Sequence, residues 1–183
     1  MSKVQDVVDF FIDSAINNPD DNMTNLRINK LLFFAQGWSL AKYNGIPLFD
    51  DDFYAWDLGP VIPSVYHRLK KAGKNKITNI INKDYDKNFS EEEQRLLIDV
   101  LRMYSKYSTS GLVDMTHKNG TPWRNVYDSQ KDNLISKDEI KAYFSMLPRL
   151  KTFSMPELSD RDFVGYRDPT TNNYVLPRNW SDE

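Results

Sequence analysis

Histidine is the side chain best suited to acid–base chemistry near neutral pH, and the sequence contains two, His67 and His117. A catalytic pair would combine His117 with an acid such as Asp57 or Asp114. The HExxH, GxSxG and P-loop patterns are absent from the sequence. We therefore expect His67 to be a surface residue and His117 to make a structural hydrogen bond, and we predict a protein that is not an enzyme, without catalytic, metal or cofactor-binding residues. An enzyme built on His117 is the alternative.

One run of basic residues is suited to face phosphate groups, because no acid interrupts it: Arg68, Lys70, Lys71, Lys74 and Lys76. The whole chain carries 24 basic and 26 acidic residues, a formal charge of -2, so it has no overall positive field to attract nucleic acid. We expect this run to be solvated, and nucleic acid to bind, if at all, only through it. A nucleic-acid-associated regulator is a second alternative. Asp6, Asp9 and Asp13 share one side of a predicted helix and are also expected to be solvated.

Residues 24 to 43 are predicted to form the central helix of the fold. Their apolar side chains point in nearly all directions at about 100° per residue, which is typical of a helix surrounded by others. Lys30 interrupts this apolar helix, so its ammonium group must emerge at a gap or pair with a buried acid. The polar groups that we nominate as its neighbours are Trp56-Asp57 and Thr116-His117.

Helical periodicity and capping signals predict six further helices, at about residues 4–17, 63–72, 91–104, 109–117, 122–127 and 137–147. Ser90 to Glu93 and Ser136 to Glu139 have the capping-box pattern. The aromatic run 53–56 predicts a short strand, with the β-prone run 77–81 as its expected partner. The predicted fold class is mainly α: a compact helical domain around a central buried helix, with a small β or extended element and a C-terminal extended arm.

The character of the sequence changes from about residue 151, where the helical period ends and prolines become frequent. The turn-forming run 168–173 lies between Tyr166 and the run 174–176, which predicts a hairpin or an extended arm. We divide the chain into a domain at 1–150 and a C-terminal extension at 151–183. The large apolar side chains of the extension predict that it packs on the domain or binds a partner.

Composition also limits the setting of the protein. The absence of cysteine excludes disulfides, thiol chemistry and cysteine-bound zinc. The longest apolar run, 31–35, is far shorter than the roughly 20 residues of a membrane-spanning helix. Acids interrupt the apolar residues near the N-terminus, unlike a secretory signal. We expect a cytoplasmic protein with no membrane partner.

Three blocks of the sequence follow one another in a recognisable order. The first is residues 25–38, NLRINKLLFFAQGW. The second contains PLFD at 47–50, Phe53, Ala55-Trp56, Gly59-Pro60-Val61 and Pro63-Ser64-Val65-Tyr66. The third contains Leu112, Thr116-His117 and Pro122-Trp123, before the predicted helix at 140–144. Together, over about residues 4 to 147, they resemble the SocA-like antitoxin family, or Panacea domain, which includes phage-associated GepA-like proteins.

The resemblance implies an antitoxin that binds a toxin encoded beside it and neutralises it by direct binding, in the cytoplasm of a bacterial host cell and without a cofactor. A phage or mobile-element origin fits it. The SocA branch implies an alternative, a proteolytic adaptor that delivers the bound toxin to a bacterial protease. The candidate motif or partner-related residues are Lys30, Trp38, Trp56, Gly59, Pro60, Tyr66, Thr116, His117, Pro122 and Trp123.

Overall fold

The computed structural model describes residues 2–16, 22–148, 150, 166–167 and 174–175. The chain divides into two units, Met1–Thr152 and Phe153–Glu183. In the second unit, strands β4 (Tyr166–Arg167) and β5 (Tyr174–Val175) pair antiparallel, as the turn-forming run between them predicted. The rest of the C-terminal extension lies outside the described residues, so its packing on the domain or on a partner stays a prediction.

Helices dominate the described residues of the first unit. The α-helices are α1 (Lys3–Ile16), α2 (Asn25–Lys42), α3 (Pro63–Leu69), α4 (Glu91–Tyr104), α5 (Thr109–His117), α6 (Pro122–Val126) and α7 (Lys137–Met146). Two short 3-10 helices are η1 (Lys70–Ala72) and η2 (Tyr85–Asn88). A small sheet consists of β1 (Phe53–Trp56), β2 (Gly59–Val61) and β3 (Asn133–Ile135). The predicted fold class, mainly α with a small β element, is confirmed. None of the helices in this described part is long and apolar enough to cross a bilayer.

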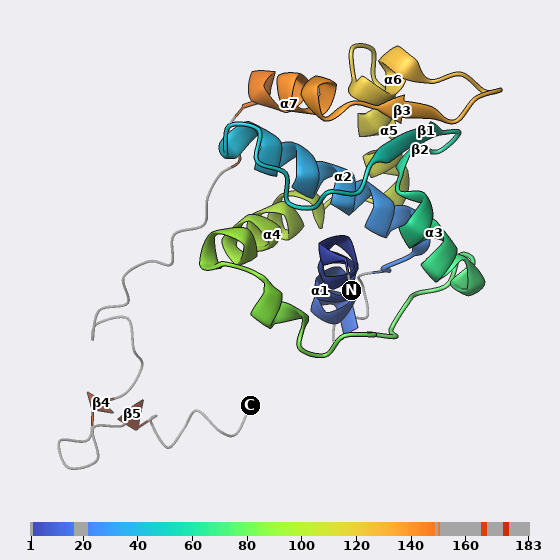
Figure 1. The fold of residues 1–183 in the computed structure, drawn as a ribbon. Helices are drawn as coiled ribbons and strands as arrows, with labels where there is room; N and C mark the ends of the chain where they lie inside the picture. The colour runs from blue at the N-terminus through green and yellow to red at the C-terminus, as the bar shows by residue number, and fades with distance from the viewer. Residues whose placement is uncertain (1, 17–21, 149, 151–165, 168–173, 176–183) are drawn as a thin grey trace. The chain divides into compact units, whose positions relative to one another are not determined.

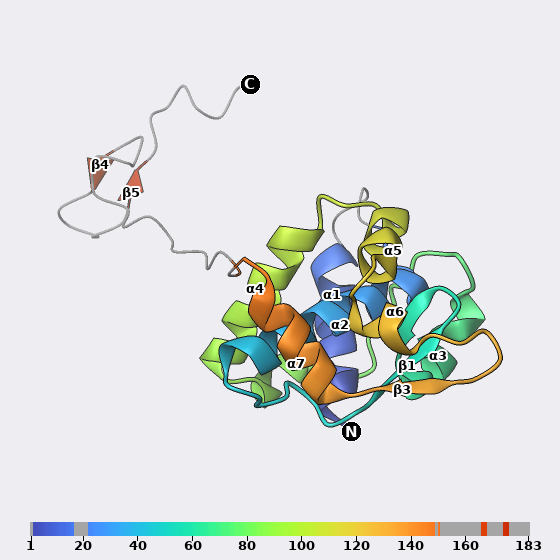
Figure 2. The same ribbon diagram turned by 90° about the horizontal axis from the view of Figure 1, so that it is seen from above.

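Helix α2 is the centre of the first unit. It lies between α7 on one side and α1 and α4 on the other (Figure 1), and it also contacts α3, α5 and β2. Leu32 and Phe33 are 0% and 1% exposed. The prediction of a central buried helix is therefore confirmed. The sheet, α3, α5 and α6 gather at the N-terminal end of α2, which both views show (Figures 1 and 2).

Capping signals located several helix starts correctly. Ser90 and Glu93 form both bonds of the capping box that begins α4. At α7 the Ser136 hydroxyl accepts from the Glu139 amide, but the Glu139 carboxylate contacts that hydroxyl rather than the Ser136 amide, so only half of the second predicted capping box forms. Pro122 opens α6, because a helix start does not need the amide hydrogen that proline lacks.

The sheet has the order β2-β1-β3, with both pairings antiparallel. In β1, Ala55 pairs with Pro60 of β2 on one side and with Asn133 of β3 on the other. The predicted pairing of β1 with residues 77–81 is therefore wrong. That run instead donates amides to α1 and to the connection between α1 and α2: Ile77 donates to the carbonyl of Met23 at 2.8 Å, and Ile81 donates to the Asp9 carboxylate at 3.2 Å.

Two acids of α1 are internal rather than solvated, which corrects the expectation of a wet acidic face. Asp9 is completely buried and accepts from Arg68 and from the amides of Ile81 and Asn82. Asp6 accepts from the side-chain amide of Asn82 at 2.7 Å and from the side-chain amide of Asn88, at the end of η2. Asp13 is exposed, as expected. The two buried carboxylates therefore fix the loop before α4 onto α1.

Aromatic rings fill the space between α2, α7 and the sheet. The Phe33 ring meets those of Phe53 and Phe144 edge to face, at 5.4 and 5.6 Å between centroids. Phe144 also covers Gly37, where an added Cβ would lie 2.2 Å from the ring. The small residue at 37 thus lets α7 approach the backbone of α2 closely.

We expect Phe33→Ala to lower the free energy of unfolding by about 3–5 kcal/mol, because it removes a buried ring and leaves a cavity between three elements. Urea unfolding followed by circular dichroism measures this. Met146→Ala, at a side chain that is 76% exposed, is the matched control and should change stability by less than about 0.5 kcal/mol. Equal effects of the two substitutions would contradict a core position for Phe33.

Candidate functional site

Lys30 lies in the interior of the fold, and none of the acids that the structure describes is bonded to it. It is completely buried, and its ammonium nitrogen donates to the Pro60 carbonyl oxygen at 2.8 Å. Burial lowers the pKa of Lys30 to about 7, since the charged form loses its hydration. The prediction that Lys30 emerges at a gap or pairs with a buried acid is therefore wrong; a backbone carbonyl is its partner.

Gly59 and Thr116 close around the Lys30 amine. Gly59 has a φ of +105°, in the region that favours glycine. A Cβ at this position would lie 2.7 Å from the Lys30 nitrogen and 2.8 Å from the Thr116 hydroxyl oxygen. Thr116 itself donates to the Val113 carbonyl at 2.8 Å. The structure thus brings together four predicted site residues: Lys30, Gly59, Pro60 and Thr116.

An aromatic stack adjoins this group at the end of α5. The His117 ring lies parallel to the Trp123 ring at 3.8 Å, and Trp123 stacks in turn on Tyr127 at 4.4 Å. The Trp123 indole N–H donates to the carbonyl of Trp56 at 2.8 Å, which ties α6 to β1. The Tyr127 hydroxyl donates to Asp57 at 2.9 Å.

The surroundings of His117 disfavour its charged form. Burial, followed by the charge of Lys30, lowers the pKa of His117 below its ordinary value, although Asp114 opposes this. A neutral imidazole stacked on Trp123 differs from the cation that a helix C-terminus would favour. Its buried Nε2 has no hydrogen-bond partner among the described residues. Asp57, one of the two acids nominated for a catalytic pair, is bonded to Tyr127 instead.

Other predicted site residues lie apart from Lys30. Trp38 is a core residue near the far end of α2, where its indole N–H donates to the Tyr104 hydroxyl at 3.0 Å. Trp56 and Tyr66 meet edge to face at 5.0 Å, and both line a groove of about 810 Å³ beside the β1–β2 hairpin. Pro122 is buried at the start of α6.

The basic run does not form one free surface. Arg68 is paired with the buried Asp9 and also donates to Gln5 at 2.8 Å, while Lys76 donates to the Ala15 carbonyl at 2.7 Å. Only Lys70, Lys71 and Lys74 are exposed. The interior partners of Arg68 explain why it belongs to the fold rather than to a phosphate-facing patch.

Four polar residues of α2 were missed as a group by sequence reasoning. Asn25, Asn29, Gln36 and Ser39 are buried, and at 100° per residue they fall within a sector of about 80°. Such a narrow stripe of uncharged polar side chains was the available signal. We call these four residues the α2 polar stripe.

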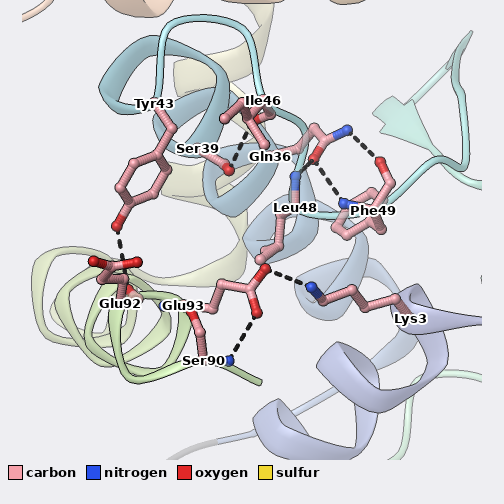
Figure 3. A network of polar contacts seen from close by, with 10 residues as sticks. All are labelled: Lys3, Gln36, Ser39, Tyr43, Ile46, Leu48, Phe49, Ser90, Glu92 and Glu93. Carbon is pink, nitrogen blue, oxygen red and sulfur yellow. Dashed lines mark hydrogen bonds and ion pairs between the residues drawn. The ribbon is translucent and has the colours of Figure 1, made fainter. Parts of the chain in front are cut away.

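Backbone groups of the segment that follows α2 are the main partners of this stripe. Gln36 accepts from the amides of Leu48 and Phe49 and donates to the Phe49 carbonyl at 2.8 Å (Figure 3). Ser39 donates to the Ile46 carbonyl at 3.0 Å. At the other end of the helix, Asn29 accepts from the Ile62 amide at 3.0 Å, and the Asn25 side chain donates to the Tyr66 carbonyl at 3.1 Å.

Comparison with known proteins gives the class of this fold. Residues 28–124 match the model of the family described as antitoxin SocA-like, Panacea domain. This range contains all ten predicted site residues, from Lys30 to Trp123. Because the match covers more than half of the chain, the protein belongs to this family of SocA-like antitoxins.

A particular relative is the protein named antitoxin SocA from Caulobacter vibrioides (strain NA1000 / CB15N). It is 33% identical over 128 residues, and the alignment covers 63% of this chain and 65% of the relative. The chain therefore spans just under two thirds of the length of this relative. No solved structure matches the chain.

The low pKa of Lys30 predicts a measurable dependence of stability on pH. The folded protein holds this proton with a pKa of about 7, against an ordinary value of 10.5, so the unfolded chain binds more protons between these values. The contribution of Lys30 to stability therefore rises with pH from about 7 to about 10.5 and is constant below that window. Lys30→Met removes this titration.

Between pH 7 and pH 9, we expect the free energy of unfolding of the natural protein to rise by about 2 kcal/mol relative to Lys30→Met. Urea unfolding at a series of pH values measures the two slopes. Lys118→Met is the control, since this lysine is exposed and its loss should leave the slope unchanged. Parallel curves for the natural protein and Lys30→Met would show that the buried amine keeps an ordinary pKa.

Proposed function

We propose that this protein is an antitoxin that neutralises a partner toxin by direct, stoichiometric binding and performs no chemistry on it. Its membership of the SocA-like antitoxin family, over residues 28–124, is the observation that carries the proposal. The interior of the fold supports it, because Lys30, Gly59 and Thr116 are buried and packed so closely that no room for a substrate is left between them. We further propose a cytoplasmic setting in a bacterial host and an origin on a phage or mobile element.

Co-expression tests this proposal directly. The protein encoded by the neighbouring gene is induced in a bacterial host with and without this chain, and growth and co-purification are measured. We expect growth to recover and the two proteins to purify as a complex of fixed stoichiometry. No recovery and no complex would overturn the antitoxin proposal.

The lifetime of the neighbouring protein separates masking from the adaptor alternative. Masking leaves its half-life unchanged or longer, because the toxin accumulates in the complex. An adaptor that delivers the toxin to a protease shortens that half-life while growth recovers. The nucleic-acid alternative is tested separately, by measuring retention of the purified protein on DNA at graded salt concentrations.

His117→Ala distinguishes a structural histidine from a catalytic one. It removes a ring that stacks on Trp123, so we expect a loss of about 1 kcal/mol in stability with neutralisation retained. Thermal unfolding and the growth assay measure the two effects, and His67→Ala, at an exposed position, is the control. Lost neutralisation at an unchanged melting temperature would instead favour a direct or catalytic role for His117.

The proposed role of the C-terminal extension is tested by deletion after Met155. If the extension packs on the domain, stability falls by a few kcal/mol, and if it is an arm for a partner, neutralisation or assembly fails while stability holds. Thermal unfolding, size-exclusion chromatography with light scattering and the growth assay are measured on the same preparation. Unchanged values in all three would contradict any role of this segment in packing or binding.

A further inference from the structure

A groove beside the β1–β2 hairpin combines exposed apolar groups with charge. It lies between the hairpin turn, α3 with η1, and residues 128–132, and the start of α2 lines it as well. We call it the hairpin groove. Its volume of about 810 Å³ falls within the range of protein ligand sites, roughly 300–1,000 Å³. Segments that range from the start of α2 to residue 132 thus build one concave surface.

Aromatic and aliphatic side chains supply the apolar part of the hairpin groove. Trp56 and Tyr66 meet edge to face, and Leu58 at the hairpin turn is 56% exposed. The buried indole N–H of Trp56 has no hydrogen-bond partner among the described residues. Because this nitrogen is shielded, the groove offers an occupant the apolar surfaces of the Trp56 and Tyr66 rings rather than the indole N–H.

The charges around the hairpin groove are unequally satisfied. Asp57 accepts from the Tyr127 hydroxyl, and Asp128 is paired with Lys131 at 3.7 Å. Lys70 and Lys74 also line the groove, are exposed and form no ion pair with any described residue, and the same is true of Asp132. The charge left to be complemented beside α3 and η1 is therefore positive, whereas the segment 128–132 leaves one negative charge at Asp132.

We infer that the hairpin groove binds an extended segment of the partner toxin, which places an apolar side chain against Trp56 and Tyr66 and a carboxylate beside Lys70 and Lys74. This inference rests on the proposed function, because it names the surface through which the antitoxin holds its toxin. A buried aromatic contact with a charged rim is a common arrangement at protein interfaces. A complementary acid would chiefly steer association and fix the direction of the segment.

The first experiment does not require the toxin. A phage-displayed library of random dodecapeptides is selected on the immobilised full-length protein, and enriched peptides are titrated by fluorescence anisotropy. We expect peptides that combine an apolar or aromatic residue with Asp or Glu. Lys70→Glu/Lys74→Glu should weaken them by about tenfold or more, and Trp56→Phe, which keeps a ring but reduces its apolar area, by about threefold to tenfold.

Lys83→Glu/Lys118→Glu is the matched control, since it makes the same change in charge at exposed lysines that do not line the groove. Circular dichroism and the melting temperature verify that every variant is folded. If no such peptide is enriched, or if both charge-reversal variants weaken the peptides equally, the hairpin groove is not a binding site for an acidic apolar segment.

The same variants are then tested in the co-expression assay. We expect Lys70→Glu/Lys74→Glu to lose neutralisation while Lys83→Glu/Lys118→Glu keeps it, and an enriched peptide to compete with the toxin for the purified protein. Retained neutralisation by Lys70→Glu/Lys74→Glu would overturn the groove as the toxin-binding surface while leaving the antitoxin function intact. Failure of the natural protein to neutralise would overturn the function, and the peptide titrations would still decide what the groove binds.

Discussion

The constraint on which this fold depends is that the irregular chain after α2 must be hydrogen-bonded although it runs against the core. Backbone amides and carbonyls that are removed from water without a partner cost roughly 1–3 kcal/mol each. Residues 46–62 form no helix, so their backbone groups need other partners. Side chains of the α2 polar stripe supply several of them. Gln36 alone satisfies the amides of two residues and one carbonyl. The helix is therefore buried on all sides and still polar where the following segment touches it.

Everything at the hairpin end of the molecule follows from this attachment. Asn29 binds the Ile62 amide and Lys30 the Pro60 carbonyl, so adjacent residues of α2 place the strand β2. Placing β2 brings the turn at Gly59 against Thr116, and the register of β1 then carries Trp56 to α6 and to α3. A buried lysine is a costly anchor, and the fold reduces the cost by favouring the neutral amine, which still donates a hydrogen bond.

Local signals predicted the helices well, because the capping residues and the apolar periodicity that define a helix lie within that helix or next to it in the sequence. The bounds of α5 and the capping box of α4 agree with the sequence prediction. Partners that are distant in sequence were not predictable in this way. Residues 77–81 have strand-forming side chains, but the amides of Ile77 and Ile81 donate to Met23 and Asp9 instead of to a strand. No residue near this run in the sequence indicates that a carboxylate of α1 will accept from it. The partner of Lys30 was missed for a similar reason, since any residue type can offer a carbonyl.

The predicted site residues also separate into two roles that a motif alone does not distinguish. Lys30, Gly59 and Thr116 are buried against one another and Trp123 is also buried, so a partner cannot reach them without opening the fold. Trp56 and Tyr66 belong to the same sequence blocks but reach the surface at the hairpin groove. The buried residues fix the shape of this surface, whereas exposed neighbours such as Leu58, Lys70 and Lys74 set its chemistry and can change without disturbing the core. In the binding mode proposed here, the fold keeps the hairpin groove in one place while a few side chains at its rim decide the preference for a partner.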